Sequence, residues 1–162
     1  MAIREAEAKA IRHIIEARFG ADGARNKNFA ICGDLNDYQE RLVISGSKRE
    51  GYQFTPATEP RSALDVFSRD GFAVNPVLRR PVDDRWTLYH SRGPQEQHLC
   101  QLDYIWLSPS LAERNPNRIP EIIRKSPALS SPLSKVEKRL ANSVIALVLS
   151  RVANFVFFSG TL

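Results

Sequence analysis

The sequence predicts an α/β protein, because one helical pattern and two apolar runs of strand length stand out in it. Residues 2–19 repeat apolar side chains at helical spacing, whereas residues 29–32 and 101–108 are apolar runs too short for a typical helix. A length of 162 residues with 43% apolar residues suits a single soluble domain with a sizeable core. We therefore expect one folded α/β unit.

The first expected element is an amphipathic helix over residues 2–19, followed by Gly20 as a C-cap. Charged side chains cover one side of this helix. The side expected to face the core carries a central stripe and two flanking residues: Ile3, Ala6, Ala10, Ile14 and Ala17, widened by Ile11 and Ile15. A polar linker over residues 21–28 then leads to the first strand.

Residues 37–60 are expected to form mainly a loop with at most one short helix, because glycines and prolines interrupt them. This loop carries Arg41, Lys48 and Arg49, and Arg61 follows it. These cations either form a solvated basic surface or contact a phosphate group.

The later elements are shorter. We expect a short helix or strand over residues 62–67 and an extended segment over residues 71–77. Residues 85–90 and 99–107 read as two strands of a hairpin, joined by a turn that contains glycine and proline. Prolines then punctuate an irregular segment over residues 109–120.

Composition narrows the cellular setting and the partners. The net charge of +5 and a pI near 9.5 permit an anionic partner such as nucleic acid, although a solvated basic surface has the same composition. Cys32 and Cys100 fit small buried thiols of a reducing compartment, with one disulfide as the alternative. Charges interrupt every apolar run before Phe29, so we expect a cytoplasmic protein without a secretory signal.

The first strand ends in Gly33-Asp34-Leu35-Asn36-Asp37, which combines two carboxylates and an amide. Oxygen groups of this kind bind hard cations, which makes this strand end a candidate for metal or phosphate chemistry. The same residue types are ordinary turn formers. The second apolar run adds Asp103, which is either a positioned functional group or an exposed aspartate of an edge strand.

Gly33-Asp34-Leu35-Asn36 at a strand end, followed by Leu102-Asp103-Tyr104-Ile105 in a later strand, resembles the endonuclease/exonuclease/phosphatase superfamily. That superfamily includes deoxyribonuclease I, abasic-site endonucleases, inositol polyphosphate phosphatases and sphingomyelinases. The resemblance implies part of a four-layer α/β sandwich like that of deoxyribonuclease I, over residues 1–125. It also implies metal-dependent hydrolysis of phosphate esters, either as a phosphodiesterase or nuclease or as a phosphatase.

The resemblance also assigns roles to individual residues. Asp34 would act as general base toward the attacking water and would also contact a Mg²⁺ or Mn²⁺ ion. The Asn36 amide would hold a phosphoryl oxygen or the shell of that metal ion. Asp103 would orient a catalytic histidine, which the family carries in a later Ser-Asp-His. No histidine follows Asp103, and the family's N-terminal Asn and Glu have no counterpart before the first helix. We therefore expect this polypeptide to be weak or inactive alone.

The remaining histidines and aromatic residues have simpler interpretations. His98 reads as a surface or hairpin residue, because one His-Leu-Cys without a second ligand pair is weak evidence for zinc. Trp86, Tyr89 and Tyr104 either stack on a substrate base or belong to the core. For Trp86 we expect packing between sheet and helix.

Residues 126–162 depart from the family pattern, since they are first rich in serine and proline and then apolar. The apolar run over residues 143–158 contains Arg151 near its centre, so it fits a buried helix, a membrane anchor or a tail foreign to the fold. The main alternative to a hydrolase is a non-catalytic remnant or binding module. Such a module would hold nucleic acid or anionic lipid through its basic surface.

Overall fold

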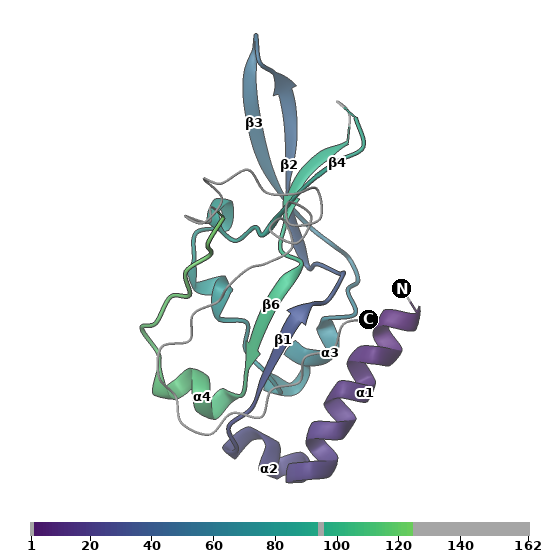
Figure 1. Cartoon of the computed structure of the whole chain (residues 1–162), viewed down its shortest axis with the longest axis vertical. Coiled ribbons are helices and arrows are strands. Elements are labelled where there is room, and N and C mark those ends of the chain that lie inside the picture. The colour runs from purple at the N-terminus through teal and green to yellow at the C-terminus, as the bar shows by residue number, and fades with distance from the viewer. Residues whose placement is uncertain (1, 94–95, 125–162) are drawn as a thin grey trace, which may run out of the picture.

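The structure, a computed structural model, describes residues 2–93 and 96–124 (Figure 1). Within these residues, helices combine with two antiparallel sheets, so the α/β expectation is confirmed at this coarse level. The predictions for residues 126–162, including the apolar run, lie outside the described residues. No helix of the described ranges has the length and apolar composition that a bilayer crossing requires.

Four α-helices and three short 3₁₀ helices occur in the described residues. They are α1 (Ala2–Phe19), α2 (Ala21–Asn26), α3 (Asp65–Ser68), α4 (Pro109–Arg114), η1 (Arg69–Gly71), η2 (Pro76–Arg79) and η3 (Val82–Asp84).

Two of these helices correct the sequence prediction. α2 replaces the expected polar linker, and α4 occupies part of the expected irregular segment. The start of α4 has a local explanation: the Ser108 hydroxyl accepts a hydrogen bond from Leu111 N, and Pro109 stands at the first helical position. A proline that was interpreted as a breaker is thus a helix start.

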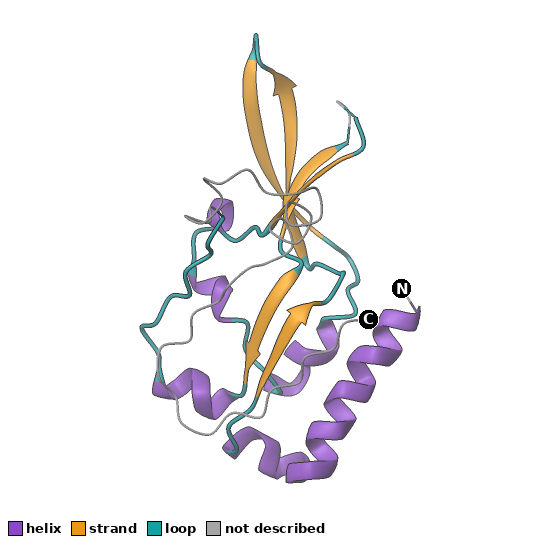
Figure 2. Cartoon of the chain, in the orientation of Figure 1, coloured by secondary structure: helices purple, strands orange, loops and turns teal. Residues whose placement is uncertain are grey.

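The strands form two separate sheets (Figure 2). The smaller sheet pairs β1 (Ala30–Asp34) with β6 (Asp103–Leu107). The larger sheet has the order β3-β2-β5-β4, and its strands are β2 (Glu40–Ser47), β3 (Gly51–Thr58), β4 (Leu88–Ser91) and β5 (Gln97–Cys100).

β2 and β3 form a hairpin that occupies most of residues 37–60, so the prediction of a loop there is wrong. Pro56 is tolerated because β3 lies at the edge of the sheet, where one side of the strand donates no ladder hydrogen bond. Gly46 has a φ of +89°, and a Cβ there would lie 2.2 Å from the carbonyl oxygen of Gly51. Pro56 and Gly46 therefore belong to the strands of the hairpin and do not interrupt them.

The expected strand over residues 99–107 is two strands in different sheets. The hairpin of β4 and β5 is confirmed, but the chain leaves the larger sheet after Cys100 and enters the smaller one at Asp103. Residues 35–39 cross in the other direction, from β1 to β2. The two sheets therefore meet beside the ends of β1 and β5.

The main hydrophobic core lies between the helices and one face of the smaller sheet. The ring centroids of Phe67 and Trp106 are 5.7 Å apart, and those of Phe29 and Phe72 are 5.2 Å apart. The buried cluster contains Ala8, Ile15, Ala24, Phe29, Ile31, Leu64, Val66, Phe67, Phe72, Ala73, Tyr104 and Trp106. These helices therefore cover the face of the sheet that carries Ile31, Tyr104 and Trp106.

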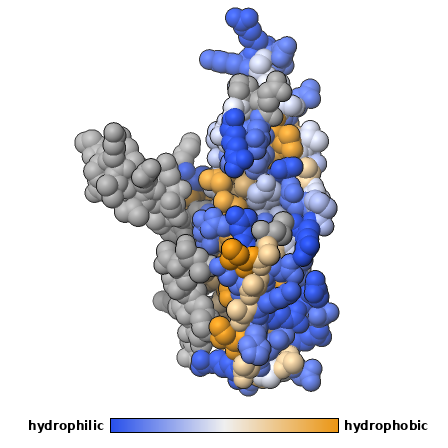
Figure 3. Space-filling model, turned by 90° about the vertical axis from the view of Figure 1, so that its right-hand side faces the viewer, coloured by the Kyte–Doolittle hydropathy of each residue, from blue (hydrophilic) through white to orange (hydrophobic). Residues whose placement is uncertain are grey.

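The face of α1 that we expected in the core is mostly exposed. Ile3 and Ile14 lie on the surface, whereas Ala8 and Ile15 are buried and Ile11 packs partly against the core. Figure 3 views the side on which Figure 1 places α1, and it shows apolar residues along a band of a largely hydrophilic surface. Of the residues predicted to face the core, only the two flanking ones, Ile11 and Ile15, point inward.

Arg12 explains this rotation of the helix. Its Nη1 donates hydrogen bonds to the carbonyl oxygens of Val66, at 3.1 Å, and Arg69, at 3.3 Å. Its guanidinium also lies 4.8 Å from the centroid of the Phe72 ring. Because these groups satisfy the cation, a charged residue occupies the side of α1 that packs on the core.

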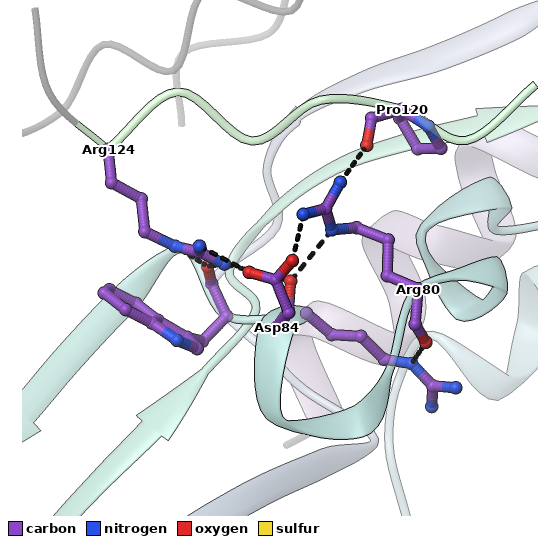
Figure 4. Close-up of polar contacts among 6 residues, drawn as sticks. Arg80, Asp84, Pro120 and Arg124 are labelled. Atoms are coloured by element: carbon purple, nitrogen blue, oxygen red, sulfur yellow. Dashed lines mark hydrogen bonds and ion pairs between the residues drawn. The ribbon is translucent and has the colours of Figure 1, made fainter.

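Hydrogen bonds of Arg80 and Arg124 connect residues 120–124 to the 3₁₀ helix η3 (Figure 4). Arg124 contacts the Asp84 carboxylate at 2.6 Å, and Arg80 binds both this carboxylate and the Pro120 carbonyl oxygen. Hydrogen bonding to Arg124 is the largest cause that lowers the pKa of Asp84. Trp86 is half-buried, and the Arg124 guanidinium lies 4.0 Å from its ring centroid.

The orientation of α1 predicts a contrast between two neighbouring isoleucines. Ile15 is 2% exposed and Ile14 is 49% exposed. Ile15→Ala should lower the free energy of unfolding by about 2–4 kcal/mol, because it opens a cavity in the core. Ile14→Ala should change it by less than about 1 kcal/mol. Urea denaturation of both variants measures the difference, and equal losses would contradict this orientation.

Candidate functional site

Asp34 and Asp103 are direct partners across the smaller sheet. β1 and β6 run antiparallel, and their register places Asp34 opposite Asp103 at the end that faces the larger sheet. Neighbouring residues outside the strands continue the ladder, since Leu35 N donates to the Leu102 carbonyl oxygen at 2.9 Å. Two carboxylates that are far apart in sequence are thus brought side by side.

The hydrogen-bond pattern brings these two side chains especially close. In an antiparallel pair, positions that exchange hydrogen bonds alternate with positions that do not, and side chains approach more closely at the latter. Leu35 N donates to the Leu102 carbonyl oxygen, and the Asp103 N–H is bound to the Thr87 hydroxyl instead of to β1, so Asp34 and Asp103 occupy the kind of position that exchanges no hydrogen bond. Their Cα atoms are then about 4.5 Å apart.

The surroundings of Asp103 favour its protonated form. Burial is the main cause that raises the pKa of Asp103, and the nearby charge of Asp34 adds to it. The Thr87 hydroxyl acts in the opposite direction through a hydrogen bond to the Asp103 side chain. The hydroxyl oxygen also accepts hydrogen bonds from the backbone N–H of Leu102 (3.0 Å) and from that of Asp103 (3.2 Å). Thr87 therefore fixes the start of β6.

Asn36 stands on the exposed turn that follows Asp34. Its φ of +51° is left-handed, a conformation that asparagine adopts more readily than most residues. Its backbone N–H donates to Oδ1 of Asp34 at 2.9 Å. The turn-former interpretation is therefore confirmed, since one carboxylate oxygen of Asp34 shapes the turn, while Asp34 and Asn36 both remain exposed.

Asp37 has a structural role. This buried carboxylate accepts hydrogen bonds from Ala63 N at 2.7 Å, Tyr38 N at 3.0 Å and the Ser62 hydroxyl at 3.2 Å. These contacts hold the segment that precedes α3. Of the two acids in the Asp-Leu-Asn-Asp segment, only Asp34 is exposed.

A hollow of about 200 Å³ lies near the junction of the sheets, but neither Asp34 nor Asp103 lines it. Its lining includes Asn75, Gln101 and Tyr104, and the side chains of Asn75 and Gln101 are joined by a 3.1 Å hydrogen bond. Tyr104 and Asp103 are consecutive in a strand, so they point to opposite faces. The hollow is therefore separate from the carboxylate pair.

The cysteines do not supply a reactive nucleophile here. Both thiols are free, and burial raises the pKa of Cys32 and, to about 11, that of Cys100. They therefore remain protonated near neutral pH. Cys100 is buried as expected, whereas Cys32 is only half-buried.

His98 is a hairpin residue as predicted, but it is buried. Its ring lies 4.7 Å from the ring of His90 and 5.6 Å from the ring of Tyr38, measured between centroids. Burial is the main cause that lowers the pKa of His98, and the nearby charges of His90 and Arg41 lower it further. No local sequence pattern indicates this cluster, because it depends on the pairing of β4 with β5.

The four basic residues in and directly after the expected loop divide into two groups. Arg41 lies 3.1 Å from Glu59, and Arg61 lies 2.6 Å from Glu5. Lys48 and Arg49 are exposed at the turn between β2 and β3, and no ion pair among the described residues involves them.

The donor set suits some cations better than others. The described part of the chain contains no group of three or more His, Cys, Asp or Glu side chains arranged to hold a metal ion. Two carboxylates with a neighbouring amide do not make the closed site that zinc requires. They fit Mg²⁺, which keeps several waters and is often bound by one or two carboxylates together with substrate phosphate.

Comparison of the chain with protein-family models, with curated proteins and with solved structures found no match.

The contrast between Asp34 and Asp37 predicts opposite effects on stability. Asp37→Ala should lower the free energy of unfolding by about 2–4 kcal/mol, because it leaves buried donors without an acceptor. Asp34→Ala should change it by less than about 0.5 kcal/mol or raise it, because it removes a like charge from Asp103. Denaturant titration at neutral pH measures both, and a loss at Asp34 as large as that at Asp37 would contradict these assignments.

The raised pKa of Asp103 predicts a pH-dependent gain from Asp103→Asn. The folded state holds the Asp103 proton more tightly than the unfolded state, so its contribution to stability falls as pH rises from the usual aspartate range through the raised pKa. Asparagine does not titrate. The free energy of unfolding of the variant minus that of the wild type should therefore increase between about pH 3 and pH 7. A constant difference across this range would show that Asp103 titrates normally.

Proposed function

We propose that this protein is a metal-dependent hydrolase of phosphate esters, of the endonuclease/exonuclease/phosphatase type. The described helices and sheets would correspond to part of the four-layer α/β sandwich of that superfamily. The substrate would be a phosphodiester, such as nucleic acid, or a phosphomonoester.

The observation that carries this proposal is the register of β1 and β6. The resemblance rests on two short motifs separated by more than sixty residues of sequence, and a shared site requires them to meet in space. The structure pairs the strands that contain them, with Asp34 opposite Asp103. Had these strands belonged to different sheets, a common site would have been excluded.

The exposure of each residue is compatible with its proposed role. Asp34 is exposed and ready to align and deprotonate a water molecule, and the exposed Asn36 amide would contact a phosphoryl oxygen or the metal shell. A divalent cation at this position would stabilise the charge that develops on the phosphate. A cation near the pair would also offset the repulsion between the Asp34 and Asp103 charges.

The proposal includes slow turnover by this chain alone. In the resemblance Asp103 orients a histidine, yet His13, His90 and His98 all precede Asp103 in sequence. Proton transfer by a positioned side chain typically contributes about 10²–10⁴-fold to a rate. Without that group, the remaining contribution comes from the cation and from the alignment of water by Asp34.

Metal binding and hydrolysis are tested together on the full chain. Titration with Mn²⁺, followed by the electron paramagnetic resonance signal of the free ion, should show binding to the wild type that Asp34→Asn/Asp103→Asn removes. Hydrolysis of bis(4-nitrophenyl) phosphate and of plasmid DNA should require Mg²⁺ or Mn²⁺ and should fall by at least about 10²-fold in Asp34→Ala.

A matched control separates the site from general charge. Asp22→Asn/Glu113→Gln removes two exposed carboxylates from α2 and α4 and changes the net charge by the same amount as the double site variant. This control should bind Mn²⁺ and turn over like the wild type. A folded wild-type protein that binds no Mn²⁺, or whose hydrolysis survives Asp34→Ala, would refute the proposal.

A further inference from the structure

The hairpin of β2 and β3 projects from the rest of the described fold (Figure 1). Every residue of β3 except Ala57 is exposed, although the strand contains two aromatic side chains. Large apolar surface that stays in contact with water in a folded protein commonly marks a binding surface.

Three aromatic residues share one face of the larger sheet. Tyr52 and Phe54 are two residues apart in β3 and are 55% and 53% exposed. Strand geometry puts them on the same face, about 7 Å apart. Register places Tyr89, 51% exposed, on this face too, because Pro56, Leu42, Leu99 and Tyr89 stand opposite one another in turn across the four strands. We call Tyr52, Phe54 and Tyr89 the aromatic face.

Positive charge adjoins the aromatic face. Lys48 and Arg49 are exposed at the turn that joins β2 to β3, only three or four positions before Tyr52. β3 itself contains no charged residue, and one exposed acid, Glu50, follows the two cations in the same turn. Exposed aromatic rings spaced along a sheet beside cations provide stacking for bases and contacts for phosphates.

We propose that the aromatic face and the Lys48-Arg49 turn bind single-stranded nucleic acid. Successive bases stack on Tyr52 and Phe54, whereas Tyr89 is a separate platform, because Leu42 and Leu99 between it and β3 are buried. The two cations contact the backbone phosphates. A second copy of this chain is a poorer occupant, because its net positive charge would oppose association. The proposed binding requires neither metal nor hydrolysis.

The test is fluorescence anisotropy of a labelled 20-nucleotide oligothymidine titrated with the full-length protein in EDTA, at several salt concentrations. EDTA excludes metal-dependent turnover, so the result is independent of the proposed hydrolase activity. Phe54→Leu keeps an apolar side chain but removes the ring, and it should weaken binding by about 5- to 150-fold. The slope of log affinity against log salt should remain unchanged for this variant.

Removing the cations should have a different signature. Lys48→Ala/Arg49→Ala should reduce the magnitude of that slope by about 1.4, since each lost phosphate contact contributes about 0.7 on single strands. Arg4→Ala/Lys27→Ala is the matched control, because both residues are exposed away from the hairpin and the change in net charge is the same. This control should reduce the slope by much less.

Three results of the binding experiments would overturn the proposal. They are the absence of binding by the folded wild type, equal binding by Phe54→Leu and the wild type, and equal slopes for the two double variants. Size-exclusion chromatography with light scattering examines the competing occupant. A wild-type dimer that becomes a monomer in Phe54→Leu would assign the aromatic face to self-association instead.

Discussion

The antiparallel pairing of β1 with β6 is the interaction on which the other parts of the described fold depend. One face of this two-stranded sheet contributes Ile31, Tyr104 and Trp106 to the core beneath α1 and α3. The end of this sheet that carries Asp34 and Asp103 is connected by short segments to β2 and β5 of the larger sheet. A slip of one residue in this register would turn every side chain of one strand to the opposite face, so the apolar face and the carboxylate pair are specified together.

The carboxylate pair carries an energetic cost that its neighbours only partly offset. Like charges directly across a sheet are destabilising, and burial adds to the cost at Asp103. A hydrogen bond from Thr87 stabilises the Asp103 carboxylate, whereas the backbone N–H of Asn36 binds one oxygen of the Asp34 carboxylate. Asp37 shows the contrasting case, because each of its hydrogen bonds holds the protein backbone or a serine hydroxyl. Unfavourable placement of titratable groups is typical of functional sites, and this is the physical basis of the proposed hydrolase.

The two sheets present different surfaces. The smaller one is covered by helices on one face and carries Asp34 and Asp103 on the other. The larger one extends outward as a hairpin with half-exposed aromatic rings and a basic turn. Because the phosphate chemistry is proposed at the junction and nucleic-acid binding on the projecting hairpin, either proposal can fail without the other.

Local patterns in the sequence predicted α1, β1 and the β4–β5 hairpin, because helical spacing and short apolar runs are encoded by neighbouring residues. Contacts between distant segments decided the rest. Arg12 donates hydrogen bonds to carbonyl oxygens of α3 and η1, and these bonds determine which face of α1 is buried. The edge position of β3 makes Pro56 compatible with a strand. The motifs identified Asp34 and Asp103 as candidates, but only tertiary structure placed them opposite each other, since register between distant strands depends on how their apolar faces pack.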